Sequence, residues 1–413
     1  MSGSKNATLP ILAATLLIPG ETILEGAPKL LDVITMIRVL RALGARAEYA
    51  ENGSVRVTTN HAIKHVAPYE LVTKMRASFF VIGPLLARKG FAKVPLPGGC
   101  AIGARPVDIH LKGLEALGTK IKMEHGFVIA RAEKLIGARV DLSFPSVGAT
   151  ETVMMAALGA EGETEIWGAA CEPEIVDLAG FLRSAGAEIF GEGSDRIRIR
   201  GNAKLHSTRF TVIPDRIETG TLILAVAASG GEVKLRHVIP HHVQSVVNIL
   251  QEGGMQITSL GDHLTVRREK PLEAFRVRTA SFPGFPTDLQ PLLTAVASTA
   301  LGTSRIEETI FESRFLHIPE LRRMGARLEV EGRHITVSGR PNLSGAPVRA
   351  RDLRGGAALV VAGLSAEGET VVNDIEQFIS RGYENLPAKL RSLGGRVDSV
   401  VHPHEEAVSH PIY

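Results

Sequence analysis

A thiol and a guanidinium stand five residues apart in one glycine-rich segment of the chain, PGGCAIGARP at residues 97–106. Its three glycines allow backbone conformations that other residues avoid, which is typical of a loop that carries function. A positive charge at Arg105 would favour the thiolate of Cys100, the reactive form of a cysteine. From the residues alone, a small apolar side chain in an ordinary glycine-rich turn is an equally good interpretation. The segment is therefore consistent with a reactive-cysteine site and equally with an ordinary turn.

Two other places combine chemistry-bearing residues with the start of a predicted helix. Lys5 and Asn6 open the first apolar segment, where backbone N–H groups and the helix dipole favour a phosphate. Asp288 stands in the sequence PTD before a later helix pattern, so its carboxylate could act as a base. A simple helix N-cap is the preferred interpretation of Asp288 from the residues alone.

The elements that position these candidate residues follow a repeated pattern along the chain. Six amphipathic helix patterns each end in a glycine and continue into two short strands. We expect each glycine to take the left-handed conformation that ends a helix. The glycines in question are Gly44, Gly118, Gly186, Gly253, Gly325 and Gly394.

Six further helix patterns are rich in small apolar residues on nearly every side, as at residues 153–160 and 222–229. Such helices are buried, so we expect them inside each domain. Strand-like stretches precede them, which gives strand, helix, strand, helix, strand, strand, six times at a period of roughly 70 residues. The first copy already begins at its helix, and we expect that about one strand of sequence is absent upstream. The fold class is α/β.

The composition is typical of a globular protein and argues against some classes of binding partner. The chain has 413 residues, of which 44% are hydrophobic and 22% charged, so it can bury a large core. Its 47 Lys plus Arg against 44 Asp plus Glu, without a basic block, give little support to nucleic-acid or membrane binding. Its two cysteines fit a reducing compartment, by default the cytoplasm. Cys171 precedes a helix pattern without a flanking glycine or arginine, and we interpret it as structural.

The sequence predicts no metal and no cofactor. It contains no HExxH or CxxC motif, and the pair His241–His242 is better interpreted as a polar turn than as two ligands. A P-loop and a dinucleotide fingerprint are also absent from the sequence.

Several long motifs, in order, resemble the enolpyruvyl transferases along the whole chain. Besides PGGCAIGARP they include SGSKNATLP at residues 2–10, RPVDIHLKGLEALG at 105–118, PDRIETGT at 214–221 and ISRGYENL at 379–386. The resemblance is greatest to the branch that uses UDP-N-acetylglucosamine. It implies a two-domain inside-out α/β barrel with three repeats in each domain. We expect residues 5–212 to form the first domain, with the Cys100 loop, and residues 213–413 the second. In that family the first strand belongs to the second domain, where its absence would leave an unpaired edge.

The resemblance also implies a reaction. The enolpyruvyl group of phosphoenolpyruvate passes to the 3-hydroxyl of UDP-N-acetylglucosamine and phosphate leaves, which is the first committed step of peptidoglycan synthesis. Cys100 would donate a proton to the substrate and form a covalent adduct with it, while Asp288 would serve as base. Arg314 and Arg354 would lie near the phosphoenolpyruvate carboxylate. The remaining residues implied for this substrate, three of them around its phosphate, are Lys5, Asn6, Arg105 and Arg381.

For the sugar nucleotide, the resemblance implies residues from five places in the sequence, and two of them, Phe144 and Ile310, would contribute mainly backbone contacts. They are Arg76, Arg105, Pro106, Val107, Asp108, Ile109, Phe144, Pro145, Ser146, Val147, Asp288 and Ile310. Ser146 also fits a simple helix cap.

Two alternatives remain open. The related transferase that acts on shikimate 3-phosphate shares the fold and the phosphoenolpyruvate chemistry, but it resembles neither the cysteine loop nor RPVDIH. A catalytically silent sugar-nucleotide-binding paralogue would also fit the motifs. Lys5, Cys100 and Asp288 are all present, so the sequence gives no reason for silence except the expected absence of the first strand.

Overall fold

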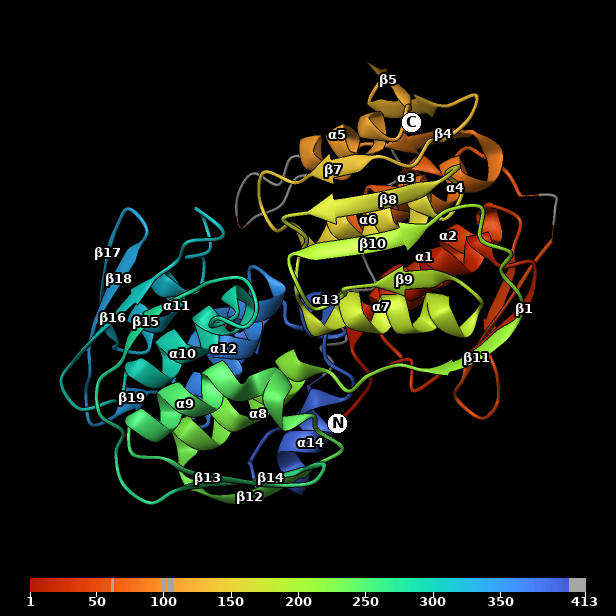
Figure 1. Cartoon of the computed structure of the whole chain (residues 1–413). Coiled ribbons are helices and arrows are strands. Elements are labelled where there is room, and N and C mark those ends of the chain that lie inside the picture. Colours follow the sequence, from red (N-terminus) through yellow and green to blue (C-terminus); the bar gives the residue numbers. More distant parts are fainter. Residues whose placement is uncertain (61–62, 99–101, 103–106, 401–413) are drawn as a thin grey trace, which may run out of the picture.

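The computed structural model describes residues 1–60, 63–98, 102 and 107–400 of the chain. Its buried apolar residues form two clusters, one between Ala7 and Val212 and the other between Ile217 and Leu390. Figure 1 shows the two corresponding halves, red to yellow-green in one and green to blue in the other. The two cores support the predicted domain boundary at residues 212–213, which stays a prediction.

Apolar helices lie inside each half, as predicted. In α8 (Arg216–Ser229) every residue from Ile217 to Ala228 is buried. A helix that is apolar on all sides gains hydrophobic free energy only when neighbours cover it completely. The helices α8, α10 (Gln290–Ala297) and α12 (Leu353–Gly363) therefore pack on one another in the second half.

The first half has the same arrangement. The inner helices are α1 (Lys5–Ala14), α4 (Ile82–Lys89) and α6 (Val147–Ala157), with the 3-10 helix η2 (Arg76–Val81) packed against all three. Further helices of the two halves are α2 (Leu31–Ala42), α3 (Tyr69–Val72), α5 (Asp108–Ala116), α7 (Pro173–Ser184), α9 (Gln244–Glu252), α11 (Ile318–Arg323), α13 (Glu376–Ile379) and α14 (Leu386–Ser392).

Small sheets cover these helices from outside (Figure 1). Three sheets have four strands. In each of them the first two strands of the sheet order pair in parallel, and the other neighbouring strands pair antiparallel. They are β11 (Thr208–Thr211)-β1 (Gly20–Glu25)-β3 (Val55–Thr59)-β2 (Arg46–Tyr49), β7 (Arg139–Asp141)-β8 (Glu163–Trp167)-β10 (Arg196–Arg200)-β9 (Glu188–Phe190) and β15 (Arg276–Arg278)-β16 (Thr303–Glu307)-β18 (His334–Ser338)-β17 (Arg327–Glu331).

Two sheets have three strands, and two parallel pairs complete the described strands. They are β4 (Phe91–Pro95)-β6 (Phe127–Arg131)-β5 (Lys120–Glu124), β12 (Gly231–Arg236)-β14 (His263–Arg268)-β13 (Gln256–Leu260), β19 (Leu343–Ser344)-β21 (Ala366–Glu367) and β20 (Pro347–Arg349)-β22 (Val371–Asn373). β12 is therefore an edge strand in the described part of the chain. Because the sheets are separate, the inside-out arrangement consists of sheets around helices without one continuous ladder among the described residues.

Five of the six predicted glycine stops have the expected positive φ, and one prediction was wrong. Gly253 has φ −73°, and the left-handed residue is the next one, Gly254, with φ 99°. A side chain at position 253 would still be excluded, since a Cβ there would lie 2.8 Å from Phe275 Cε1.

The beginning of the chain lies beside the segment that joins the two halves. Ser4 N–H donates to the Ile213 carbonyl at 2.7 Å, and Asp215 N–H donates to the Ser2 carbonyl at 2.9 Å. α1 and α8, the inner helices of opposite halves, consequently begin next to each other. Among the described residues, no helix is both long and apolar enough to cross a membrane.

Candidate active site

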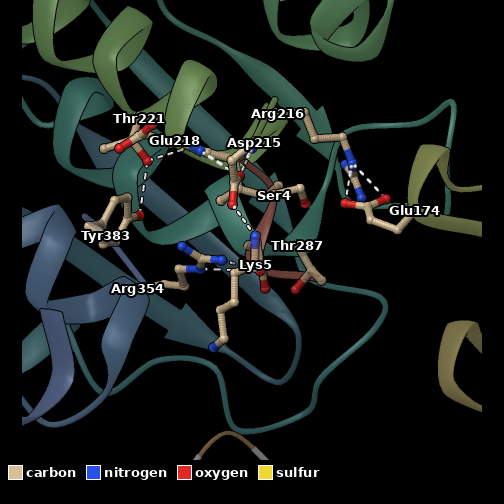
Figure 2. A network of polar contacts seen from close by, with 12 residues as sticks. Ser4, Lys5, Glu174, Asp215, Arg216, Glu218, Thr221, Thr287, Arg354 and Tyr383 are labelled. Carbon is tan, nitrogen blue, oxygen red and sulfur yellow. Dashed lines mark hydrogen bonds and ion pairs between the residues drawn. The ribbon is translucent and has the colours of Figure 1, made fainter. Parts of the chain in front are cut away.

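Asp215 joins the starts of the two inner helices. Its Oδ1 caps α8 by accepting the N–H groups of Ile217 and Glu218 at 2.7 and 2.9 Å. Its Oδ2 accepts Lys5 N–H at 3.1 Å, at the first residue of α1. Figure 2 shows this carboxylate above Lys5. The N–H group of Lys5 is thus already used inside the protein, so the expected phosphate at this helix start would depend on the Lys5 ammonium and other donors.

The Lys5 ammonium meets a carboxylate that also binds an arginine from the other half. Asp32 Oδ2 lies 2.7 Å from Lys5 Nζ, and Asp32 Oδ1 accepts Arg381 Nε–H at 2.8 Å. Burial lowers the pKa of Lys5, and the charge of Asp32 offsets part of that effect. Burial alone would raise the pKa of Asp32, but Lys5 and Arg381 outweigh it and keep the pKa below its ordinary value. The structure therefore brings together two of the predicted phosphate-binding cations.

A second carboxylate, Asp288, lies between two buried arginines. Arg314 Nη2 donates to Asp288 Oδ1 at 2.7 Å, and Arg354 Nη2 donates to Oδ2 at 2.9 Å. Burial alone would raise the pKa of Asp288, but the charges of Arg354 and Arg314 hold it far below its ordinary value. Asp288 lies in the short 3-10 helix η4 (Thr287–Leu289), for which the structure gives no side-chain cap, so the N-cap interpretation was wrong. Its carboxylate instead binds the arginines predicted to recognise a carboxylate.

Both arginines are fixed by further polar groups. Arg314 Nη1 donates to Thr287 Oγ1 at 2.8 Å, and the Arg354 guanidinium lies 5.2 Å from the Tyr383 ring centroid. The Tyr383 hydroxyl is 2.9 Å from Thr221 Oγ1 on α8, as Figure 2 shows. Arg314 Nε is buried without a hydrogen-bond partner in the part of the chain that the structure describes. A donor in that position can bind an anion that approaches the guanidinium.

An ion pair beside these clusters joins the halves again. Arg216 Nε on α8 lies 3.0 Å from Glu174 Oε1 on α7, and both side chains are almost completely buried. Burial lowers the pKa of Arg216, but Glu174 and Glu172 outweigh it, and the pKa is raised. Glu172 accepts Phe282 N–H at 3.2 Å, a contact between the halves. The pKa of Glu151 on α6 is well above its ordinary value because of burial and these two neighbouring carboxylates.

The described residues predicted for the sugar nucleotide lie mainly at the starts of three adjacent elements in the first half. Arg76 is the first residue of η2, Asp108 the first of α5 and Val147 the first of α6, and α6 packs against both other elements. Ser146 Oγ caps α6 by accepting Ala149 N–H at 3.3 Å, so its simple cap role is observed. Phe144 is 42% exposed.

The other predicted residues are distributed as follows. Val107 is buried, and Pro145, Ile109 and Asn6 are half-buried. Ile310 belongs to the second half and lies near the Asp288 cluster, because Glu308 accepts both Ile310 N–H at 2.8 Å and the Thr287 hydroxyl at 2.9 Å.

Cys100, Arg105 and Pro106 lie outside the described residues, so their predicted roles are not tested. Ile102, which belongs to the same predicted loop, is described and buried. Its carbonyl accepts Ser313 N–H at 3.1 Å, next to Arg314. This part of the loop therefore contacts the half that carries Asp288. Elsewhere, the described residues contain no cluster of three or more His, Cys, Asp or Glu arranged to hold a metal.

Sequence reasoning missed the roles of Asp32, Asp215 and Arg216. Asp32 lies in the first turn of a predicted helix, where an acidic residue needs no other reason than the helix dipole. Asp215 and Glu218 have the spacing of a capping box, a signal that could have located the start of α8. In the structure Glu218 instead accepts Ser2 N–H at 2.9 Å, a contact more than 200 residues apart in sequence that spacing cannot predict.

Known proteins are similar to this chain over nearly its whole length. The family model for EPSP synthase (3-phosphoshikimate 1-carboxyvinyltransferase) matches residues 1–390. The chain is 52% identical over 398 residues to UDP-N-acetylglucosamine 1-carboxyvinyltransferase 1 of Caldanaerobacter subterraneus, covering 96% of this chain and 95% of the relative. It is 48% identical to UDP-N-acetylglucosamine 1-carboxyvinyltransferase of Dichelobacter nodosus, covering 97% and 95%.

Solved structures confirm the fold. The enolpyruvyl transferase NikO from Streptomyces tendae superimposes with a TM-score of 0.87 at 25% identity, covering 98% of this chain and 96% of that one. EPSP synthase from Acinetobacter baumannii superimposes with a TM-score of 0.72 at 19% identity, covering 97% and 96%. The predicted fold class is thereby confirmed.

Proposed function

Because the chain belongs to the enolpyruvyl transferase family that includes the UDP-N-acetylglucosamine 1-carboxyvinyltransferases, we propose that it transfers the enolpyruvyl group of phosphoenolpyruvate to the 3-hydroxyl of UDP-N-acetylglucosamine. The observation that carries this proposal is the identity of 48–52% with relatives of that name over nearly the whole chain. The two carboxylate–cation clusters supply the matching chemistry. We further propose that the protein works in the cytoplasm on small-molecule substrates, in the first committed step of peptidoglycan synthesis.

The reaction is an addition followed by an elimination. A proton adds to the methylene carbon C3 of phosphoenolpyruvate while the sugar 3-oxygen bonds to C2 and releases its own proton to a base. In the second step C3 loses a proton, the C2–O bond to phosphate breaks, and the double bond reforms in the product. The site must therefore supply an acid, a base and cations for one phosphate and one carboxylate.

Arg314 and Arg354 suit the substrate carboxylate. Each guanidinium can bind a carboxylate through two parallel hydrogen bonds, and both are buried, where such bonds are strong. Arg314 Nε, which has no hydrogen-bond partner among the described residues, supports this assignment. Lys5 and Arg381 suit the phosphate because they already share one anionic partner, with Asn6 beside them and Arg105 assigned to the same group by resemblance.

Asp288 suits the base, on one condition. A carboxylate whose pKa is held far below its ordinary value is a weak proton acceptor. When a substrate carboxylate engages Arg314 and Arg354, it neutralises part of the charge that lowers the pKa of Asp288. Binding of phosphoenolpyruvate would thus raise the basicity of Asp288, the group that takes the proton of the sugar 3-hydroxyl. Cys100 remains the proposed acid and covalent partner.

The shikimate alternative is disfavoured because the similarity to EPSP synthase in the solved structures is 19% and concerns the fold alone. A direct test compares acceptors. Phosphate release from phosphoenolpyruvate should require UDP-N-acetylglucosamine and should not be supported by shikimate 3-phosphate. Phosphate release that depends on shikimate 3-phosphate would refute the proposal. Phosphate release by folded protein that is no faster with UDP-N-acetylglucosamine than with phosphoenolpyruvate alone would also refute it. Absence of turnover together with retained UDP-N-acetylglucosamine binding would favour the silent paralogue.

A further inference from the structure

Asp32 is the only described residue whose carboxylate pairs with both Lys5 and Arg381. It lies in the first turn of α2, and its side chain is 5% exposed. Each carboxylate oxygen serves a different cation, Oδ2 for Lys5 at 2.7 Å and Oδ1 for Arg381 at 2.8 Å. The two cations are thereby held by one rigid partner.

The cations come from opposite halves of the molecule. Lys5 opens α1 of the first half, whereas Arg381 follows α13 in the second half. The backbone reinforces the same junction, since Leu31 N–H donates to the Ser380 carbonyl at 2.9 Å. Nearby, Lys29 N–H donates to Glu384 Oε1 at 2.7 Å. Asp32 therefore sits where the two halves meet.

The pairing leaves donors for a substrate. An ammonium has three N–H donors and a guanidinium five, so one carboxylate cannot satisfy both groups. The charge balance also favours an anion, because two cations share one negative charge. Without Asp32, the buried Lys5 would lose the partner that favours its charged form, and Arg381, whose side chain is 34% exposed, would lose its anchor to the first half.

We propose that Asp32 is a positioning residue that holds Lys5 and Arg381 together as a ready site for the phosphate of phosphoenolpyruvate and makes that site depend on contact between the halves. This inference rests on the proposed function. Asp32 acts through the two cations, and neither donates a proton to the substrate nor receives one from it. Its removal should weaken recognition of the phosphate and spare recognition of the sugar nucleotide.

The variant Asp32→Asn keeps the side-chain size and removes the charge. We expect its KM for phosphoenolpyruvate to rise by roughly tenfold or more, because misplaced substrate-binding groups commonly cost that much. The inhibition constant of inorganic phosphate, used as a probe of the phosphate site, should rise by a similar factor. Affinity for UDP-N-acetylglucosamine should stay unchanged. Asp141→Asn is the matched control, since Asp141 pairs with Arg139 at an exposed site.

The pH profile separates positioning from a merely structural role. Among the described residues, the charged groups that act on Lys5 are Asp32, Arg354 and Arg381, and of these three Asp32 alone favours the protonated ammonium. In Asp32→Asn the pKa of Lys5 falls further, so the alkaline limb of kcat/KM for phosphoenolpyruvate should move to lower pH. Asp32→Glu, which keeps the charge, should restore that limb at least in part and remains informative if the Asn variant folds poorly.

The possible failures are distinguishable. If the unaltered protein shows no phosphate release that depends on both substrates, the proposed function fails. If it is active but Asp32→Asn leaves the phosphate inhibition constant and the alkaline limb unchanged, the role of Asp32 is refuted. An equal loss of affinity for UDP-N-acetylglucosamine would also overturn it, because that loss indicates general damage to the fold.

Discussion

Asp288 and Asp32 have one property in common at the scale of residues, since each carboxylate binds two cations. The arginines at Asp288 come from one half, whereas the cations at Asp32 come from both. Buried charges of this kind are stable only when they are paired, and removing one partner leaves the others uncompensated. Even a substitution of Asp288 or Asp32 that changes the side-chain size little should therefore weaken substrate binding.

The reactivity proposed for Cys100 can be tested by substitution. Cys100→Ser should abolish turnover and labelling by a thiol-reactive epoxide of the fosfomycin type. Cys171 is half-buried, and burial with the nearby carboxylates of Glu172 and Asp195 raises its pKa, so its thiolate is scarce at neutral pH. Mass spectrometry of the labelled protein measures the outcome.

Cys171→Ser is the control for this experiment. It should keep both activity and labelling. Labelling of Cys100→Ser as strong as that of the unaltered protein would show that another group reacts and would contradict the assignment of Cys100.

The sequence indicated candidate site residues, whose roles stay predictions, but it did not indicate which distant side chains they contact. Lys5, Asp288, Arg314, Arg354 and Arg381 stand in motifs that the resemblance covers, and the structure brings them together in two clusters. Asp32 was not predicted, because its contact with Arg381 spans 349 residues of sequence. Local patterns indicate which residue begins a helix, but not which distant side chain it meets.

At the scale of elements, the prediction of the helices succeeded because burial leaves a strong pattern in the sequence. The small apolar residues of α6 and α8 can be covered only by other elements, so their position inside each half followed from composition. The pairing of β11 with β1 was not predicted. These strands are nearly 190 residues apart and form a parallel pair, for which neither turn type nor loop length gives a signal.

Asp215 accepts backbone N–H groups at the starts of two helices, α1 and α8, and its removal should therefore destabilise the protein. Asp215→Ala removes the acceptor for three backbone N–H groups in two helices. Loss of an ordinary cap costs about 1 kcal/mol, and buried donors left without partners add to that cost. We expect the free energy of unfolding to fall by roughly 2–3 kcal/mol, as measured by chemical denaturation.

Ser146→Ala is a matched cap variant for comparison. Ser146 caps α6 through a single acceptor contact of 3.3 Å, so its loss should be the smaller one. Equal destabilisation by the two variants would contradict the view that Asp215 serves two helices.

At the scale of the whole molecule, the junction between the halves contains carboxylates that burial keeps partly protonated. Burial raises the pKa of Asp177 on α7 to about 7, although its carboxylate accepts Ile213 N–H at 3.3 Å. The folded protein therefore binds this proton more tightly than the unfolded chain. Its contribution to stability is complete below the unfolded pKa of about 4 and is lost as pH rises through about 7.

Asp177→Asn should remove this part of the pH dependence. An amide oxygen can still accept Ile213 N–H, and no charge has to be buried at high pH. From about pH 5 to about pH 8, the denaturation midpoint of the variant should fall less than that of the unaltered protein. Glu151, whose pKa is also raised, should retain some of the slope. An identical slope in the variant and the unaltered protein would disprove the role of Asp177.

We propose that residues from both halves together perform enolpyruvyl transfer to the sugar nucleotide. The most direct measurement is nuclear magnetic resonance of a reaction that contains the protein, phosphoenolpyruvate and UDP-N-acetylglucosamine. We expect vinyl proton signals of an enolpyruvyl ether on the sugar 3-oxygen, formed in equal amount with inorganic phosphate, and we expect these signals to be lost in Asp288→Asn. Release of phosphate without formation of the ether, or no change in either substrate with folded protein, would refute the proposed reaction.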